Sequence, residues 1–122
     1  MKRLLIFAII SLAAFVTASA SDYNVENANS IKVEGIAVTH NGRIWMSTHR
    51  LMSDGTEGLV VSFSDDVGVT WKDVKSVDDA EGGILWIAPN GGLLVFYTLE
   101  GYIYSSACPN ASDSSPIWMP QV

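Results

Sequence analysis

The sequence has little cysteine and few basic residues. Cys108 is the single cysteine among 122 residues, so no disulfide can form within the chain and the fold must be held by packing. Lysine and arginine number seven against thirteen acidic residues, for a formal net charge of −6. A surface with this balance repels the phosphates of nucleic acids and of anionic lipids. The composition therefore excludes a disulfide-stapled domain and predicts no nucleic-acid partner.

The longest hydrophobic run, residues 4–16, lies near the amino terminus and is too short to cross the core of a bilayer as a helix. Two basic residues precede it, and the small residues A-S-A follow it up to Ala20, which is the order of a secretory signal peptide. We expect cleavage after Ala20 and a secreted or periplasmic protein with no stable membrane anchor; an uncleaved amino-terminal anchor is the alternative. Removal of residues 1–20 leaves five basic and thirteen acidic residues, a formal charge of −8. The polar stretch 21–30 is expected to be a flexible leader.

Residues 31–122 show no helical periodicity. They consist of short runs rich in β-branched and aromatic residues, each bounded by Gly, Asn, Asp or Ser, which predicts an all-β fold. The expected strands are residues 33–39, 43–48, 59–64, 71–77, 84–88, 93–98 and 102–106. Most of these runs are uniformly apolar, which is typical of strands covered on both faces. We therefore expect sheets stacked face to face.

Two Asn-Gly pairs predict two hairpins. Asn41-Gly42 and Asn90-Gly91 each separate a pair of expected strands. Positive φ at both residues of such a pair matches the twist of the flanking strands, so we expect it at both pairs.

An internal repeat runs through the expected strands. Its alignment places Asn41 on Asn90, residues 60–64 on 102–106, and Trp71 on Trp118, with offsets of 49, 42 and 47. A four-stranded unit repeated after about 40 to 50 residues is the pattern of a β-propeller blade, and propellers need about four to eight blades to close. We expect an incomplete propeller of two blades, residues 31–77 and 82–122, out of about six. Its open blade face is a candidate surface for association.

The segment SFSDDVGVTW, residues 62–71, carries a spaced motif. Ser64, Asp66, Gly68, Thr70 and Trp71 follow the pattern S-x-D-x-G-x-T-W, which resembles the Asp-box of sialidases and related propellers with BNR repeats. We expect a structural turn, in which the carboxylate accepts backbone amides, the glycine takes positive φ and the tryptophan anchors in the core. A degenerate copy with a different turn is expected at residues 108–118, where the glycine is absent and a proline enters.

Residues 33–50 resemble the opening blade of sialidase-like glycoside hydrolases, and the likeness extends over residues 31–122. The resemblance implies that Arg50 binds substrate and that Asp54 is the general acid. An arginine can hold an anionic sugar group with two hydrogen bonds, and a carboxyl shielded from water can donate a proton. Glu57 is an alternative carboxyl. In the alternative interpretation, Arg50 is a solvated charge at the end of a strand and Asp54 lies in an ordinary exposed loop.

The chain departs from the sialidase pattern at Glu34, which stands where the family has the first arginine of its carboxylate-binding triad. The family's nucleophilic tyrosine, the glutamate beside it and the remaining arginines come from later blades. We therefore expect the 122-residue chain to be inactive by itself. No cofactor or metal is expected, because His40 and His49 have no ligand array at zinc spacing.

These features favour the amino-terminal part of a secreted, sialidase-like, carbohydrate-active propeller of the glycoside hydrolase type, with a glycan as ligand. The alternative is a non-enzymatic Asp-box propeller fragment that binds carbohydrate or protein.

Overall fold

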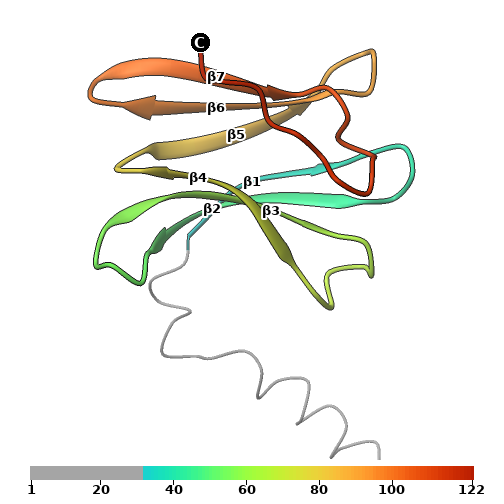
Figure 1. Cartoon of the computed structure of the whole chain (residues 1–122), viewed down its shortest axis with the longest axis horizontal. Coiled ribbons are helices and arrows are strands. Elements are labelled where there is room, and N and C mark those ends of the chain that lie inside the picture. The colour runs from blue at the N-terminus through green and yellow to red at the C-terminus, as the bar shows by residue number, and fades with distance from the viewer. Residues whose placement is uncertain (1–31) are drawn as a thin grey trace, which may run out of the picture.

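The computed structural model describes residues 32–122, which form seven β-strands and no helix (Figure 1). The strands are β1 (Lys32–Val38), β2 (Ile44–Leu51), β3 (Glu57–Ser64), β4 (Lys72–Asp78), β5 (Glu81–Ile87), β6 (Leu93–Leu99) and β7 (Tyr102–Cys108). The predicted all-β fold is therefore confirmed, and each strand begins and ends within three residues of its predicted run. The predicted signal peptide and leader, residues 1–30, lie outside the described part of the chain. Within that part, no helix is long and apolar enough to span a membrane.

The strands form two antiparallel sheets that face each other as layers (Figure 1). Sheet A has the order β1-β2-β3-β4 and sheet B the order β5-β6-β7, so every strand pairs with its neighbour in the chain. Residues 119–122 run beside β7, in the position of a fourth strand of sheet B. Ser105 and Val122 exchange two backbone hydrogen bonds of 3.0 and 2.9 Å, and the Met119 amide donates to the Ala107 carbonyl at 2.7 Å. The two sheets do not close into a ring.

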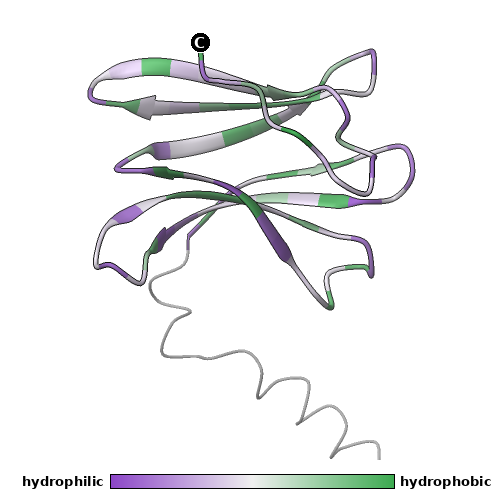
Figure 2. Cartoon of the chain, viewed as in Figure 1, coloured by the Kyte–Doolittle hydropathy of each residue, from purple (hydrophilic) through white to green (hydrophobic). Residues whose placement is uncertain are grey.

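The core lies between the two inner faces, where hydrophobic residues recur along the strands of both sheets (Figure 2). Trp45 is fully buried and packs against Phe63 and Trp118, with ring centroids 5.3 and 5.8 Å away. The expectation that most strands are covered on both faces is wrong except for β3, which is buried from its second residue to its last. The other strands alternate or are partly exposed, because each sheet has only one neighbour among the described residues.

Both predicted hairpins are present, with a different backbone. The Gly42 amide donates to the Thr39 carbonyl at 2.9 Å, and Gly42 has φ 86°. In the second hairpin, the Gly91 amide donates to the Ala88 carbonyl at 2.8 Å, and Gly91 has φ 84°. Positive φ at the two asparagines was a wrong prediction, because only the glycine of each pair takes the left-handed conformation. The asparagine side chain instead accepts the next amide after the glycine.

The internal repeat is visible in the strand registers. Gly35 pairs with Ser47 in sheet A, and Ile84 pairs with Phe96 in sheet B, which is the predicted offset of 49. The first strand of each sheet, β1 and β5, also carries a bulge one residue before this pair. The repeat predicted between the first two strands of each unit is thus confirmed.

The third strands align differently from the prediction. Ser47 pairs with Val61, and its equivalent Phe96 pairs with Ser105, so β3 and β7 are related by an offset of 44 rather than 42. A shift of two residues keeps every side chain on the same face of a strand, so the apolar pattern could not detect it. The offset of 47 at the fourth position is confirmed, because Lys75 and Val122 pair with the equivalent Val61 and Ser105.

The first strands of the two sheets approach closely. A Cβ atom on Gly35 would lie 2.6 Å from the Gly83 carbonyl oxygen, and a Cβ on Gly83 would lie 2.6 Å from Cδ1 of Leu59. The Ser47 hydroxyl donates to the same Gly83 carbonyl. A side chain on Gly35 would push β1 and β5 apart, and one on Gly83, whose φ is 140°, would press on Leu59 and Ser47 of sheet A, so glycine fits both positions.

Candidate functional site

Arg50, at the end of β2, lies in a polar cluster that crosses three strands. Its Nη2 lies 2.7 Å from Oδ1 of Asp73 on β4 and 3.2 Å from Oγ of Ser62 on β3. The Ser62 hydroxyl donates to the same carboxylate oxygen at 2.6 Å. The Arg50 side chain is 26% exposed and Asp73 is 56% exposed. The arginine is therefore partly open to solvent and anchored on one side only.

Arg50 also has a buried donor that no acceptor satisfies. Its Nε has no hydrogen-bond partner among residues 32–122. An unpaired buried donor costs about 1 to 3 kcal/mol. Arg50 therefore engages fewer of its guanidinium donors than an arginine in a purely structural salt bridge would.

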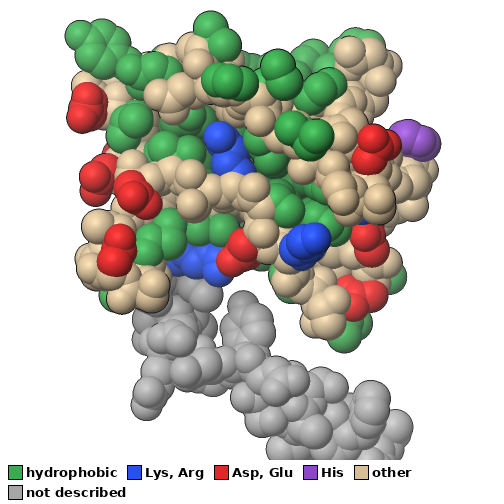
Figure 3. Space-filling model, in the orientation of Figure 1, with side chains coloured by type: hydrophobic (Ala, Val, Ile, Leu, Met, Phe, Trp, Pro, Cys, Tyr) green, Lys and Arg blue, Asp and Glu red, His purple; other side chains and the backbone are tan. Residues whose placement is uncertain are grey.

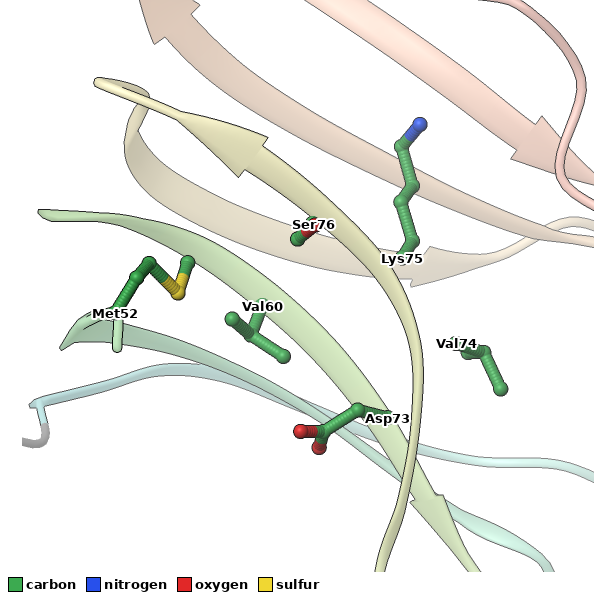
Figure 4. Close-up of a pocket in the computed structure, with 6 residues that line it drawn as sticks. All are labelled: Met52, Val60, Asp73, Val74, Lys75 and Ser76. Atoms are coloured by element: carbon green, nitrogen blue, oxygen red, sulfur yellow. The ribbon is translucent and has the colours of Figure 1, made fainter. Parts of the chain in front are cut away.

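Asp73 also lines an open hollow of about 320 Å³ on the outer side of sheet A (Figure 4). The other lining residues are Met52, Val60, Val74, Lys75 and Ser76. A bulge in β4 opposite Val61 and Ser62 turns Asp73 and Lys75 to opposite sides of the strand, as Figure 4 shows. The Lys75 side chain points toward sheet B, where its Nζ lies 5.9 Å from the centroid of the Trp118 ring and burial lowers its pKa. Of these two charged residues, Asp73 is therefore the one that lies on the same side of sheet A as Arg50.

Asp54 lies in the exposed turn between β2 and β3. Its Oδ1 accepts hydrogen bonds from the Thr56 hydroxyl at 2.6 Å and from the Thr56 amide at 3.0 Å. These two bonds lower the pKa of Asp54, whereas a general acid needs a raised one. No hydrogen bond or ion pair joins Asp54 to Arg50 among the contacts of residues 32–122. The roles of both residues stay predictions.

Glu57, the alternative carboxyl, begins β3 and lies 3.5 Å from Nε2 of His49. Glu34 lies in the bulge of β1 and forms an ion pair of 3.0 Å with Lys32. The carboxylate at position 34 is therefore already held by a cation of its own strand.

The predicted Asp-box forms one hydrogen-bonded turn between β3 and β4. Oδ1 of Asp66 accepts from the Ser64 hydroxyl at 2.7 Å and from the Thr70 amide at 2.8 Å, and Oδ2 accepts from the Thr70 hydroxyl. The Gly68 amide donates to Oγ of Ser64 at 2.8 Å, and Gly68 has φ 87°. Hydrogen bonds from Thr70 and Ser64 lower the pKa of Asp66 to about 2. A carboxylate this well satisfied is poorly suited to proton transfer.

Trp71 does not anchor in the core, so that expectation is wrong. It is 39% exposed, its Nε1 donates to the Gly68 carbonyl at 3.0 Å, and its ring lies 3.6 Å from where a Gly68 Cβ would be. The indole covers its own turn. Its repeat partner Trp118 instead packs edge-on against Trp45.

The degenerate copy in the second unit makes a different turn, as predicted, and the structure shows that this turn is the longer of the two. With the offset of 44, Asn110 takes the place of Asp66, and its Oδ1 accepts from the Ile117 amide at 2.8 Å. Cys108 takes the place of Ser64 and lies 3.6 Å from the same oxygen. Cys108 is fully buried, and burial raises the pKa of its thiol.

Arg43, which was not among the predicted site residues, joins the turns at one end of both sheets. Its side chain is 4% exposed and makes two hydrogen bonds with Asp65, of 2.7 and 3.0 Å. Nη1 donates to the carbonyls of Ala111 and Asp113 at 2.9 and 2.6 Å, and the guanidinium lies 4.0 Å from the centroid of the Phe63 ring. Two features of the sequence point to the contact between Arg43 and Asp65: Arg43 directly follows the glycine of the first hairpin, and Asp65 directly precedes the aspartate of the Asp-box.

Residues 32–122 contain no group of three or more His, Cys, Asp or Glu side chains placed to hold a metal ion. The chain was also compared with known proteins. No protein-family model, no curated protein and no solved structure matches it.

Proposed function

We propose that this chain is part of a secreted, sialidase-like β-propeller of the glycoside hydrolase type, and that it binds an anionic glycan at Arg50 without cleaving it by itself. The observation that carries the proposal is the geometry of Arg50. Its guanidinium is partly exposed, is held through one nitrogen by Asp73, which lines an open hollow, and keeps a donor without an acceptor. A sugar carboxylate could replace Asp73 and satisfy two donors of the guanidinium.

Three features support the propeller. Two meandering sheets repeat the same registers and bulges, with a fourth segment beside β7. Their first strands, β1 and β5, meet at Gly35 and Gly83, which is expected where blades converge on a central axis. The hydrogen-bonded turn around Asp66 agrees with the Asp-box resemblance.

Binding is favoured over hydrolysis by the state of the two carboxyls that the sialidase resemblance singles out, Asp54 and Glu34. The pKa of Asp54 is lowered, so this group is ionised at neutral pH and holds no proton to donate. Glu34 is paired with Lys32, where the sialidase resemblance implies an arginine. These observations favour the non-enzymatic alternative for the chain by itself.

Two variants that break the same ion pair test the proposal. Arg50→Gln removes the cation, so the affinity for acidic oligosaccharides should fall about tenfold or more, as expected for loss of a charged hydrogen bond. Asp73→Asn removes the competing carboxylate, so the affinity should rise. Isothermal titration with sialylated, uronate-containing and neutral oligosaccharides measures both effects. Equal weakening in both variants, or no binding by the unmodified chain, would refute the site.

A released-sugar assay with the same oligosaccharides tests the absence of hydrolysis. We expect no turnover by the 122-residue chain. Turnover that disappears in Asp54→Asn would restore Asp54 as the general acid and overturn this part of the proposal.

A further inference from the structure

Two hairpin turns of this chain carry the same Asn-Gly pair on a similar backbone. Gly42 and Gly91 have φ 86 and 84°, and each glycine amide donates to the carbonyl three residues earlier. Asn41 and Asn90 are both exposed. At the end of the molecule that carries both turns, on the right in Figure 3, uncharged polar side chains and backbone, drawn in tan, reach the surface. Water therefore reaches both asparagines, and burial does not distinguish them.

An Asn-Gly pair is chemically reactive because the glycine has no side chain to shield its amide nitrogen. The nitrogen loses its proton to hydroxide and forms a bond to Cγ of the asparagine. The bond from Cγ to Nδ2 breaks, and the amide nitrogen leaves as ammonia after taking a proton from water. Water then opens the succinimide ring at either carbonyl, which gives aspartate or isoaspartate. Before the ring can close, the asparagine side chain must leave its hydrogen-bond partners and rotate over the glycine nitrogen.

The side chain of Asn41 is held by three hydrogen bonds. Its Oδ1 accepts from the Thr39 hydroxyl, and from the Arg43 amide at 3.3 Å. Its Nδ2, the group that would leave, donates at 3.3 Å to the Ser112 carbonyl in the loop after β7. This loop lies beside the β1–β2 turn in Figure 1. The first turn is thus tied to the second sheet through its asparagine.

The side chain of Asn90 lacks most of these partners. Its Oδ1 accepts from the Gly92 amide at 3.1 Å, and its side chain makes no other hydrogen bond in the part of the chain that the structure describes. The internal repeat explains the difference. With the offset of 49, Thr39 corresponds to Ala88 and Arg43 to Gly92, and neither replacement has a polar side chain. The second turn therefore keeps the reactive pair without the contacts that restrain it.

We propose that Asn90 is a site of spontaneous deamidation, whereas Asn41 is protected by its hydrogen bonds. Ring closure at Asn41 must first open three hydrogen bonds against one at Asn90, which should make Asn41 about tenfold slower or more. The isoaspartate product inserts a methylene group into the backbone of a turn that two hydrogen bonds close, so this end of β5 and β6 should loosen. The inference does not depend on glycan binding or on a propeller.

A third turn of this kind contains Asp54-Gly55. Its glycine has φ 86°, and the Gly55 amide donates to the Met52 carbonyl at 3.1 Å. Aspartate closes the same ring only from its protonated form, because the oxygen that leaves Cγ departs as water. Two hydrogen bonds from Thr56 lower the pKa of Asp54 and keep it ionised. Isoaspartate should therefore not accumulate at Asp54 while it forms at Asn90.

Peptide mapping of the aged full chain tests the proposal. The protein is incubated in mildly alkaline buffer and digested with an acid protease, and mass spectrometry follows the conversion of amide to acid at each pair. In the native chain Asn90 should react about tenfold faster than Asn41 or more. In concentrated urea the two rates should converge, because neither pair then keeps its hydrogen-bond partners.

Substitution at position 39 tests the cause of the protection. Thr39→Ala copies Ala88 of the second turn, so Asn41 should react severalfold faster in the native variant. Thr98→Ala makes the same change at an exposed position of β6 and should leave the rate at Asn41 unchanged. Circular dichroism checks that both variants keep their sheets, and Thr39→Val replaces a Thr39→Ala chain that does not fold.

Four outcomes would overturn the inference. The first is a native chain in which Asn41 reacts as fast as Asn90. The second is a native chain in which neither pair reacts under conditions that modify both in urea. The third is a difference between the pairs that persists in urea, which would trace it to neighbouring residues in the sequence. The fourth is a folded variant without the Thr39 hydroxyl in which Asn41 reacts no faster.

Discussion

Replacing Arg43 with methionine should destabilise the fold by about 3 to 5 kcal/mol, the range for removing one partner from a buried charged network. The two hydrogen bonds from Nη1 to the carbonyls of Ala111 and Asp113 supply most of the effect, at about 1.5 kcal/mol or more each. The cation–π contact with Phe63 adds about 0.5 to 1 kcal/mol. The pair with Asp65 adds at most about 1 kcal/mol, because this carboxylate is 57% exposed. Methionine fills similar space, so the loss reports polar contacts rather than a cavity.

Urea denaturation followed by tryptophan fluorescence measures this loss, since Trp45 is fully buried and becomes exposed on unfolding. Two variants separate the contributions. Asp65→Asn removes only the exposed pair and should cost about 1 kcal/mol or less. Arg43→Lys keeps the charge but lacks the forked donors of the guanidinium, so its loss of stability should lie between those of Arg43→Met and Asp65→Asn. A loss below about 1 kcal/mol for Arg43→Met, with an unchanged denaturant slope, would refute the role given to this arginine.

Three further predictions concern the turn, the thiol and the sheet contact. The folded pKa of Asp66 is depressed to about 2, so its contribution to stability is fully present above about pH 4 and is lost as the pH falls through about 2. The urea midpoint should therefore drop between pH 5 and pH 2, and a drop of equal size in Asp66→Asn would contradict this cause. The Cys108 thiol should react with a thiol reagent only on unfolding, because it is fully buried with a raised pKa; fast reaction in native buffer would show that the site opens. Gly83→Ala should cost about 2 kcal/mol or more in urea denaturation, because its Cβ would lie 2.6 Å from Leu59 and its φ is 140°; an unchanged midpoint would mean that Leu59 and β5 adjust without loss of stability.

Local features of the sequence predicted the local features of the fold. The Asn-Gly pairs placed both hairpins, because a strand reversal needs a left-handed residue and glycine supplies it. The serine, aspartate, glycine and threonine of the Asp-box turn also find one another within a few residues. The alignment of β3 on β7 failed by two residues, because a period-two pattern is unchanged by such a shift.

The partners of side chains were decided by tertiary structure. Arg50 was singled out from the family resemblance, but its pairing with Asp73 depends on strand register and on a bulge in β4. Arg43 contacts a loop about seventy residues later in the chain, which no local pattern indicates. Trp71 and Trp118 occupy equivalent positions, yet within residues 32–122 only Trp118 has the other sheet to pack against.

The sequence by itself determined that this chain is all-β, that it reverses at two glycines, and that one strand unit occurs twice, because these properties depend on residue type and spacing along the backbone. Only the tertiary structure decided which faces are buried and which remain open, and which charges meet. Those outcomes depend on register and on the packing of one sheet against another: β3 is buried along almost its whole length, whereas Ile84 and Trp86 of β5 stay exposed.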